Sequence, residues 1–199
     1  MSLSPVAATD VATVVTTLEM RVRPPARPLP AVPFRLVRWP VPTVAAYRTL
    51  FARVGSPWLW YSRLAMADAA LAAILSDPQV EIHAVVDRGG IEVGMLELDR
   101  SEAGTCRIAY FGLVPELAGR GIGHWLMTHA LMLGWTRETA RMIVHTCTLD
   151  HPRALGFYRA AGFTAIARTL ETFPDPRVTG VLPADAAPQI PCLSPPSRT

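Results

Sequence analysis

Three glycines, Gly119, Gly121 and Gly123, stand at alternate positions immediately before an apolar run that favours a helix. A glycine turn of this kind can point several backbone N–H groups at one spot, beside the positive end of the following helix. Because no Cβ atoms stand in the way, phosphate oxygens can approach the backbone closely. The stretch therefore predicts a site for a phosphate-bearing ligand.

Two other phosphate-binding patterns do not fit this stretch. A Walker loop needs Gly-Lys-Ser or Gly-Lys-Thr, and the sequence contains no lysine. The GxGxxG pattern fails because His124 or Leu126 stands where its third glycine belongs. The alternative to a ligand site is a loop whose glycines only allow a strand and a helix to pack tightly.

Two segments resemble the GCN5-related N-acetyltransferase (GNAT) superfamily. Residues 111–123, FGLVPELAGRGIG, resemble its coenzyme A signature, and residues 151–163, HPRALGFYRAAGF, resemble its last helix and strand. The likeness in element order extends over residues 34–173. It implies a single domain of the α/β (α+β) class, in which helices flank a central mixed, mostly antiparallel β-sheet. It also implies an acyl-CoA-dependent N-acyltransferase of a bacterial branch, which transfers acetyl from acetyl-CoA directly to an amine.

The resemblance assigns the coenzyme to particular positions. Backbone groups of Leu113 and Val114 would meet the pantetheine arm, and His151 stands where the family has an asparagine that contacts the cofactor. The residues expected to hold the pyrophosphate, mainly through backbone N–H groups, are Gly119, Arg120, Gly121, Ile122, Gly123 and His124. Ala118 replaces the family's usual Gln or Arg, which weakens the help from that side chain.

Tyr158 is the expected general acid. It lies seven residues after His151 and four after Ala154, so the three share one helix face. The resemblance places its hydroxyl near the thioester sulfur. A tyrosine with a pKa of about 10 can protonate a thiolate whose conjugate acid has a pKa of about 8.5. The alternative is a core tyrosine whose hydroxyl meets a carbonyl group.

A base must remove a proton from the amine. Glu97 and Asp99 alternate onto the same strand face as Met95, and we expect Glu97 to act through a water molecule. Many relatives carry this carboxylate on the strand before the glycine loop, where this chain has Arg107. The alternative is that Glu97 points to solvent or pairs with an arginine.

Other polar and aromatic residues allow more than one interpretation. Trp58, Trp60 and Tyr61 can border the acceptor amine, or they can belong to the core or to a dimer surface. The residues His145, Asp150 and His151 surround Cys147, but they straddle a strand end and their side chains should diverge, so we expect no metal. Direct transfer needs no acyl-carrying cysteine, which favours a buried thiol for Cys147.

The elements that must position these residues follow from periodicity and turns. Strands are expected at 34–38, 81–87, 91–99, 107–114 and 142–146 and from 163, and helices at 43–54, 66–75, 122–138 and 151–161. The three middle strands form an antiparallel meander, and the later strand–helix alternation predicts a partly parallel sheet. Residues 11–20 are rich in β-branched side chains and can form one more strand, whose place in the sheet the sequence does not give.

Length and composition predict one domain at 34–173, preceded by an arm with a proline-rich linker at 1–33 and followed by a loose, proline-rich tail at 174–199. The net charge is +3, but residues 41–173 hold twelve arginines and twelve acidic residues, so no basic face for nucleic acid is expected. Three cysteines without a CxxC pair favour a reduced, cytoplasmic protein, and no apolar run predicts a membrane span.

Three function classes stay open at this stage. The first is the N-acyltransferase, acting on a small-molecule or peptide amine, with acetyl-CoA as co-substrate and a homodimer as a possible assembly. The second is a coenzyme-binding module without turnover, suggested by Arg107 and Ala118. The third is an interaction protein whose proline-rich ends recruit partners.

Overall fold

The computed structural model describes residues 3–25 and 28–193, which fold around one seven-stranded β-sheet with the order β2-β3-β4-β5-β6-β1-β7. The strands are β1 (Asp10–Met20), β2 (Arg35–Trp39), β3 (Val80–Val86), β4 (Glu92–Asp99), β5 (Thr105–Leu113), β6 (Arg141–Cys147) and β7 (Thr164–Pro174). The helices are α1 (Val44–Gly55), α2 (Ser62–Ala65), α3 (Asp68–Leu75), α4 (Ile122–Gly134) and α5 (Ala154–Ala160), with short 3-10 turns η1 (Ser56–Trp58) and η2 (Pro115–Leu117).

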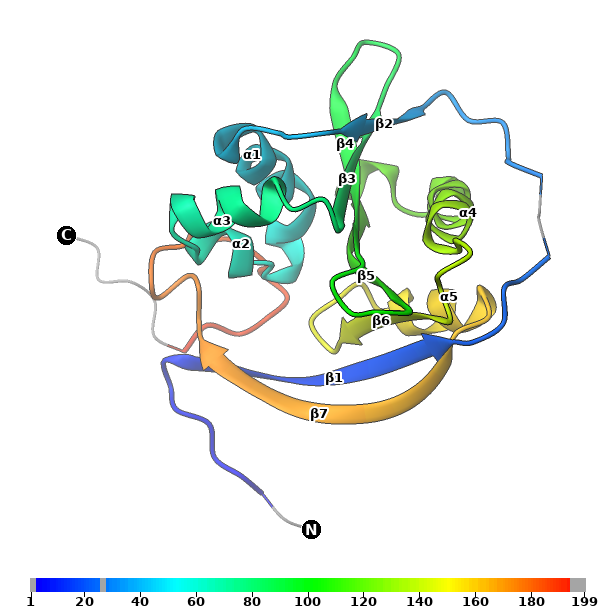
Figure 1. Cartoon of the computed structure of the whole chain (residues 1–199). Coiled ribbons are helices and arrows are strands. Elements are labelled where there is room, and N and C mark those ends of the chain that lie inside the picture. Colours follow the sequence, from blue (N-terminus) through cyan, green and yellow to red (C-terminus); the bar gives the residue numbers. More distant parts are fainter. Residues whose placement is uncertain (1–2, 26–27, 194–199) are drawn as a thin grey trace.

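The helices form two layers on the sheet. α1, α2 and α3 cover one face, and α4 and α5 cover the other (Figure 1). All neighbouring strands are antiparallel except β5 and β6, which are parallel. The predicted single domain with a mixed, mostly antiparallel sheet between helices is confirmed.

Each packed helix carries a stripe of apolar side chains at helical spacing. In α1, the side chains of Tyr47, Leu50, Phe51 and Val54 are buried. Thr43 caps this helix, since its hydroxyl accepts a hydrogen bond from the Ala46 amide at 3.2 Å.

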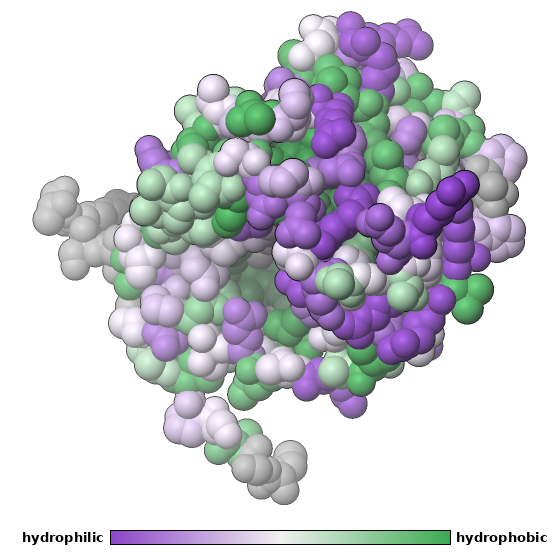
Figure 2. Space-filling model, viewed as in Figure 1, coloured by the Kyte–Doolittle hydropathy of each residue, from purple (hydrophilic) through white to green (hydrophobic). Residues whose placement is uncertain are grey.

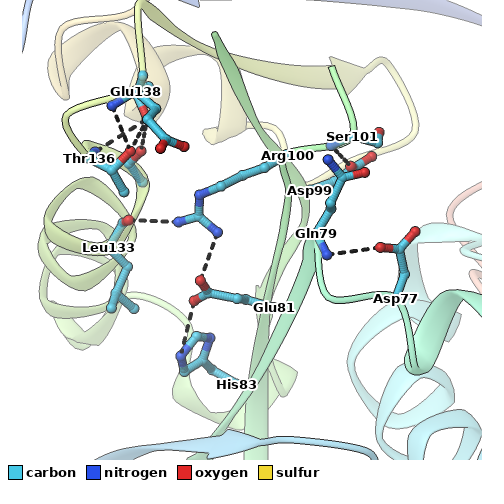
Figure 3. A network of polar contacts seen from close by, with 12 residues as sticks. Asp77, Gln79, Glu81, His83, Asp99, Arg100, Ser101, Leu133, Thr136 and Glu138 are labelled. Carbon is cyan, nitrogen blue, oxygen red and sulfur yellow. Dashed lines mark hydrogen bonds and ion pairs between the residues drawn. The ribbon is translucent and has the colours of Figure 1, made fainter. Parts of the chain in front are cut away.

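Arg100 fastens α4 to the sheet. It follows β4, and its guanidinium donates to Glu81 Oε1 on β3 at 2.8 Å and to the Leu133 carbonyl of α4 at 2.8 Å. Figure 3 shows this bridge, with His83 on the other side of Glu81. The bridge holds the C-terminal end of α4, so the N-terminal end has a defined place above β5.

The extra strand predicted at 11–20 is β1, and it lies between β6 and β7, antiparallel to both. Val15 pairs with Cys147 on one side and with Thr169 on the other. β6 and β7 therefore run in the same direction but do not pair, because β1 separates them. β1 and β7 curve together below the rest of the sheet (Figure 1).

Three expected helices differ from the observed ones. The expected helix at 66–75 is α3, which begins at Asp68 because Met66 and Ala67 are extended, and the short helix α2 before it was not expected. α4 ends at Gly134 rather than at residue 138, where the chain turns beside Met142. α5 begins at Ala154 rather than at His151, because residues 151–154 form a turn in which the His151 carbonyl accepts from the Ala154 amide at 2.8 Å and His151 Nδ1 accepts from the Arg153 amide at 3.1 Å.

The segment after β7 is not the loose tail that its prolines suggest. Arg177 is 2% exposed, pairs with Asp175 at 2.7 Å and donates to the Ile190 carbonyl at 2.8 Å. Nearby, a second apolar cluster joins residues from both ends of the chain and from the α1–α2 connection: Val11, Leu59, Phe173, Leu182 and Ala187. Residues 175–193 thus pack against the body of the protein through these contacts.

Candidate active site

A cavity opens where β5 and β6 separate. Their pairing covers only residues 105–108 of β5 and 141–144 of β6, although both strands continue beyond it. A cavity of about 610 Å³ fills the gap, lined on one side by residues 108–113 and on the other by residues 144–147. Figure 2 shows a hollow with an apolar floor on the face between the α1–α3 layer and the β1–β7 ribbon. The separation leaves β5 beyond Ile108 without a neighbouring strand on the β6 side, while β4 still pairs with it on the other side.

The glycine loop forms one end of this cavity. Gly119 and Gly121 have φ values of 76° and 78°, in the left-handed region that glycine tolerates. A Cβ atom at either position would meet no atom within 4 Å, so the space in front of the loop is open. The backbone N–H groups of residues 119–123 have no hydrogen-bond partner within the part of the chain that the structure describes. Five free donors at the start of a 13-residue helix form a cradle suited to a pyrophosphate.

Only one of the two residues expected to meet the pantetheine arm lies at the cavity. Leu113 lines the cavity, whereas Val114 does not. The Val114 amide donates to the Val93 carbonyl at 2.9 Å, and its carbonyl accepts from the Leu117 amide at 3.0 Å. The free backbone groups near a ligand are thus those of β5 before Val114. Gly119, Gly121, Gly123, His124 and His151 line the cavity, while Arg120 and Ile122 contribute to the cradle through their amides.

Tyr158 reaches the same cavity from α5. Its ring packs against Phe111, Phe157 and Phe163, with centroid distances between 5.6 and 6.2 Å. Tyr158 lines the cavity, and its hydroxyl has no hydrogen-bond partner within the described residues. Burial, and then the negative charge of Asp150, raise the pKa of Tyr158 above its ordinary value. The hydroxyl therefore stays protonated at neutral pH and can donate a proton.

Glu97 does not meet Tyr158. Its side chain is fully buried on the α1 side of β4 and lies outside the cavity lining. One carboxylate oxygen accepts from the Tyr47 hydroxyl at 2.5 Å and the other from Arg63 Nη2 at 2.5 Å. The structure thus contains the alternative that the sequence allowed, in which Glu97 pairs with an arginine. Because both oxygens are occupied and removed from the cavity, the placement argues against the expected role of Glu97 as a base.

Aromatic side chains form the opposite wall of the cavity. Trp58 and Trp60 line it, and Trp60 packs on Tyr110 of β5 with centroids 5.3 Å apart. Tyr61 points elsewhere and stacks on Phe173 at 4.8 Å. Asp150 ties this wall to the β6 end, since it accepts from Trp60 Nε1 at 3.4 Å and from the Cys147 amide at 2.9 Å. Two of the three expected acceptor aromatics therefore face the cavity.

Sequence reasoning gave His145 only a metal interpretation and did not find Glu171. Both line the cavity, from β6 and β7. Burial, followed by the positive charge of Arg107, lowers the pKa of His145 below its ordinary value, although Glu171 acts in the opposite direction. His145 is therefore a neutral imidazole at neutral pH. No sequence pattern marks Glu171. β7 reaches the cavity only through its pairing with β1, a strand from the N-terminal end of the chain.

Cys147 also lines the cavity, but it is not poised as a nucleophile. Burial, and then Asp150, raise the pKa of its thiol above the ordinary value, which favours the neutral form. Among the described residues, no three His, Cys, Asp or Glu side chains are grouped so that they could hold a metal ion. Nor does the described part of the chain contain a helix long and apolar enough to cross a bilayer.

Comparison with known families fits this geometry. Residues 79–165, which include the glycine loop and the approach to β7, match the model of the acetyltransferase (GNAT) domain. This match places residues 79–165 in the GNAT superfamily. Acyl transfer is accordingly the class of reaction that membership supports. No curated protein matched the sequence.

Solved GNAT structures share this fold. A GCN5-related N-acetyltransferase from Sphaerobacter thermophilus has a TM-score of 0.59 at 20% identity, over 81% of this chain and 51% of its own. A putative GNAT-family acetyltransferase from Novosphingobium aromaticivorans has a TM-score of 0.54 at 13% identity, over 86% and 69%. The present chain therefore spans only about half the length of the Sphaerobacter protein.

AAC(6')-Iy, solved with the bisubstrate analogue CoA-S-monomethyl-acetylneamine, has a TM-score of 0.51 at 16% identity. The match covers 68% of this chain and 94% of AAC(6')-Iy. At these identities the likeness shows the shared GNAT fold.

Proposed function

We propose that this GNAT protein is an acyl-CoA-dependent N-acyltransferase that transfers acetyl from acetyl-CoA to the amine of an acceptor. The observation that carries the proposal is that one cavity is lined by the glycine loop with its free amides, by the separated β5 edge and by Tyr158. A ligand with a diphosphate at one end and a thioester at the other matches this order of groups. The AAC(6')-Iy complex, which holds a coenzyme A conjugate on the same fold, supports the choice.

In the proposed complex, the amides of residues 119–123 hold the pyrophosphate, and free backbone groups of β5 hold the pantetheine arm. His151 and His124 line this end and can add donors. Acetyl-CoA supplies an acyl group already activated as a thioester. The residues then need only to orient the two substrates and move two protons.

The proton movements can be assigned to two side chains. His145, neutral at neutral pH, takes a proton from the acceptor ammonium, which frees the nitrogen lone pair. The new C–N bond forms as the C–S bond breaks, and Tyr158 gives its proton to the departing thiolate. The nitrogen then loses its second proton, which restores the Tyr158 hydroxyl, and His145 releases its proton to solvent. Glu97 holds Arg63 and Tyr47 in place and takes no part in the transfer.

One observation favours a second function, a coenzyme-binding module without turnover. The two carboxylate positions considered for the base are lost, since Glu97 is occupied by Arg63 and position 107 is an arginine. Such a module would keep the cradle and bind acetyl-CoA, but would release no free thiol with any amine.

Two measurements test these functions. Calorimetry with acetyl-CoA should show stoichiometric binding, and a panel of primary amines should cause acceptor-dependent release of free thiol. Binding without thiol release would support the module, and the absence of any binding would contradict both functions. Desulfo-CoA lacks the thioester and keeps the diphosphate, so its binding isolates the cradle.

A further inference from the structure

The charged groups that line the cavity differ in their surroundings. Asp150 accepts three hydrogen bonds, from Thr146 Oγ1 at 2.8 Å, from the Cys147 amide and from Trp60. Arg153 lies at the coenzyme end, one helical turn before Phe157, whose ring packs against His124 at 5.2 Å. Glu171 has no hydrogen-bond or ion-pair partner among the described residues. It is therefore the lining carboxylate that is free to bind a ligand.

Glu171 lies at the acceptor end of the cavity. It pairs with Thr13 of β1, whose hydroxyl is 2.8 Å from that of Thr148, just beyond the end of β6. Phe173, two residues further along β7, stacks on Tyr61, so this part of β7 lies next to the α1–α2 connection. A ligand nitrogen near Glu171 would thus enter from the side opposite the glycine loop.

The neighbouring wall suits a cation as well. Trp58, Trp60 and Tyr110 line the cavity, and the faces of such rings attract ammonium groups. No lysine occurs in the chain, and Arg153 is the one arginine among the described lining residues. The acceptor end therefore combines a free carboxylate with aromatic rings and contains no lining cation.

We infer that the acceptor is an amine with a second nitrogen that is protonated at neutral pH, and that Glu171 binds this second nitrogen. The inference rests on the proposed function. A carboxylate beside the reacting ammonium would stabilise its charged form and hinder the loss of its proton. A carboxylate at the far end of the acceptor site instead attracts a diamine without this penalty. Glu171 is thus a specificity-determining residue for diamines over monoamines.

The test compares two probes of equal chain length, 1,6-diaminohexane and hexylamine, on the full chain loaded with coenzyme A. Calorimetry should show about five- to tenfold tighter binding of the diamine, the range expected for one partly exposed charge pair beside aromatic rings. Glu171→Gln should remove this preference. Glu138→Gln, which removes an exposed carboxylate outside the cavity, should retain it. With acetyl-CoA, the ratio of kcat/KM values for the two amines should change in the same way.

The outcomes separate this inference from the proposed function. Equal binding of the two probes, or a diamine preference that Glu171→Gln retains, overturns the role of Glu171. In that case, thiol release with hexylamine would still support the proposed acyltransferase activity. If the diamine binds selectively through Glu171 but no amine releases thiol, the subsite stands and the acyltransferase fails. Thermal unfolding of the Glu171→Gln protein should match the wild type, because Glu171 makes no internal contact that its loss would break.

Discussion

Packing of the Tyr158 ring can be separated from proton donation by its hydroxyl through a single substitution. Its ring fills space among Phe111, Phe157 and Phe163, and a phenylalanine keeps those contacts. We expect Tyr158→Phe to lower kcat by about 100-fold, the lower limit for loss of a general acid. The dissociation constant of acetyl-CoA should stay unchanged in calorimetry. Tyr61→Phe is the matched control outside the cavity, and a normal kcat for Tyr158→Phe would assign the tyrosine to packing.

His145 gives the reaction a predictable pH dependence. The reaction requires its neutral form, so kcat/KM should rise as pH increases through the pKa of His145 and then level off. Burial and Arg107 lower that pKa below 6.5, which moves the acid limb to a pH below 6.5. Removing the positive charge with Arg107→Gln should shift this limb toward higher pH. An unchanged profile in His145→Gln would exclude the imidazole as the proton acceptor.

Glu97 should behave as a structural residue. Its removal leaves the Arg63 guanidinium partly buried beside Tyr110 without its carboxylate partner. We expect Glu97→Ala to destabilise the fold by about 3 kcal/mol, as for a broken buried ion pair. Urea unfolding measures this loss, and the folded fraction should still turn over. A Glu97→Ala protein that is stable but inactive would instead support a catalytic role for Glu97.

At the scale of elements, the loop before α4 depends on two properties of Gly121. Its φ of 78° strains any β-branched residue, and its open front face is where a ligand phosphate would lie. Gly121→Val should weaken acetyl-CoA binding at least tenfold in calorimetry. Gly90 has a φ of 85°, equally open space and a place in the β3–β4 turn, so Gly90→Val carries the same strain away from the cavity. Equal coenzyme affinities in the two variants would contradict the cradle.

Local sequence patterns predicted the helices and strands better than they predicted which of these elements lie next to one another. The glycine loop, α4 and the parallel β5–β6 pair follow from motifs that are continuous in the chain. The place of β1 does not, because any β-branched strand can pair with any free edge. Glu171 was missed, and the pairing of Glu97 with an arginine stood only as an alternative that did not identify Arg63, because only the tertiary fold brings those residues to their partners. The Pro152 turn also shortened α5 in a way that apolar periodicity does not reveal.

At the scale of the whole molecule, the segment after β7 supports the acceptor wall. Leu59 has a left-handed φ of 56° and is buried in the cluster with Leu182 and Ala187, so its neighbours Trp58 and Trp60 can face the cavity. Arg177 holds this segment closed. We expect Arg177→Met to raise the KM of the acceptor several-fold and to leave acetyl-CoA affinity unchanged. Equal effects on both substrates would show general loosening instead.

The Asp175–Arg177 pair also predicts how stability depends on pH. Although burial opposes it, Arg177 lowers the pKa of Asp175 below its ordinary value of 3.8. The stabilisation is therefore fully present at neutral pH and is lost as pH falls below about 4 through the pKa of the folded state. The difference in Tm between the wild type and Asp175→Asn should be largest near pH 7 and shrink toward pH 3. A constant difference would assign the effect to hydrogen bonding alone.

The position of β1 has a consequence for how the chain is made. Among the strands of this sheet, β1 leaves the ribosome first, yet its two partners, β6 and β7, are synthesised last. Until then its edges stay unpaired, and a half-made chain offers them to any other strand within reach. Pairing of β1 must therefore wait until β6 and β7 have been synthesised, and crowded polysomes would be the setting in which this protein is most exposed to mispairing.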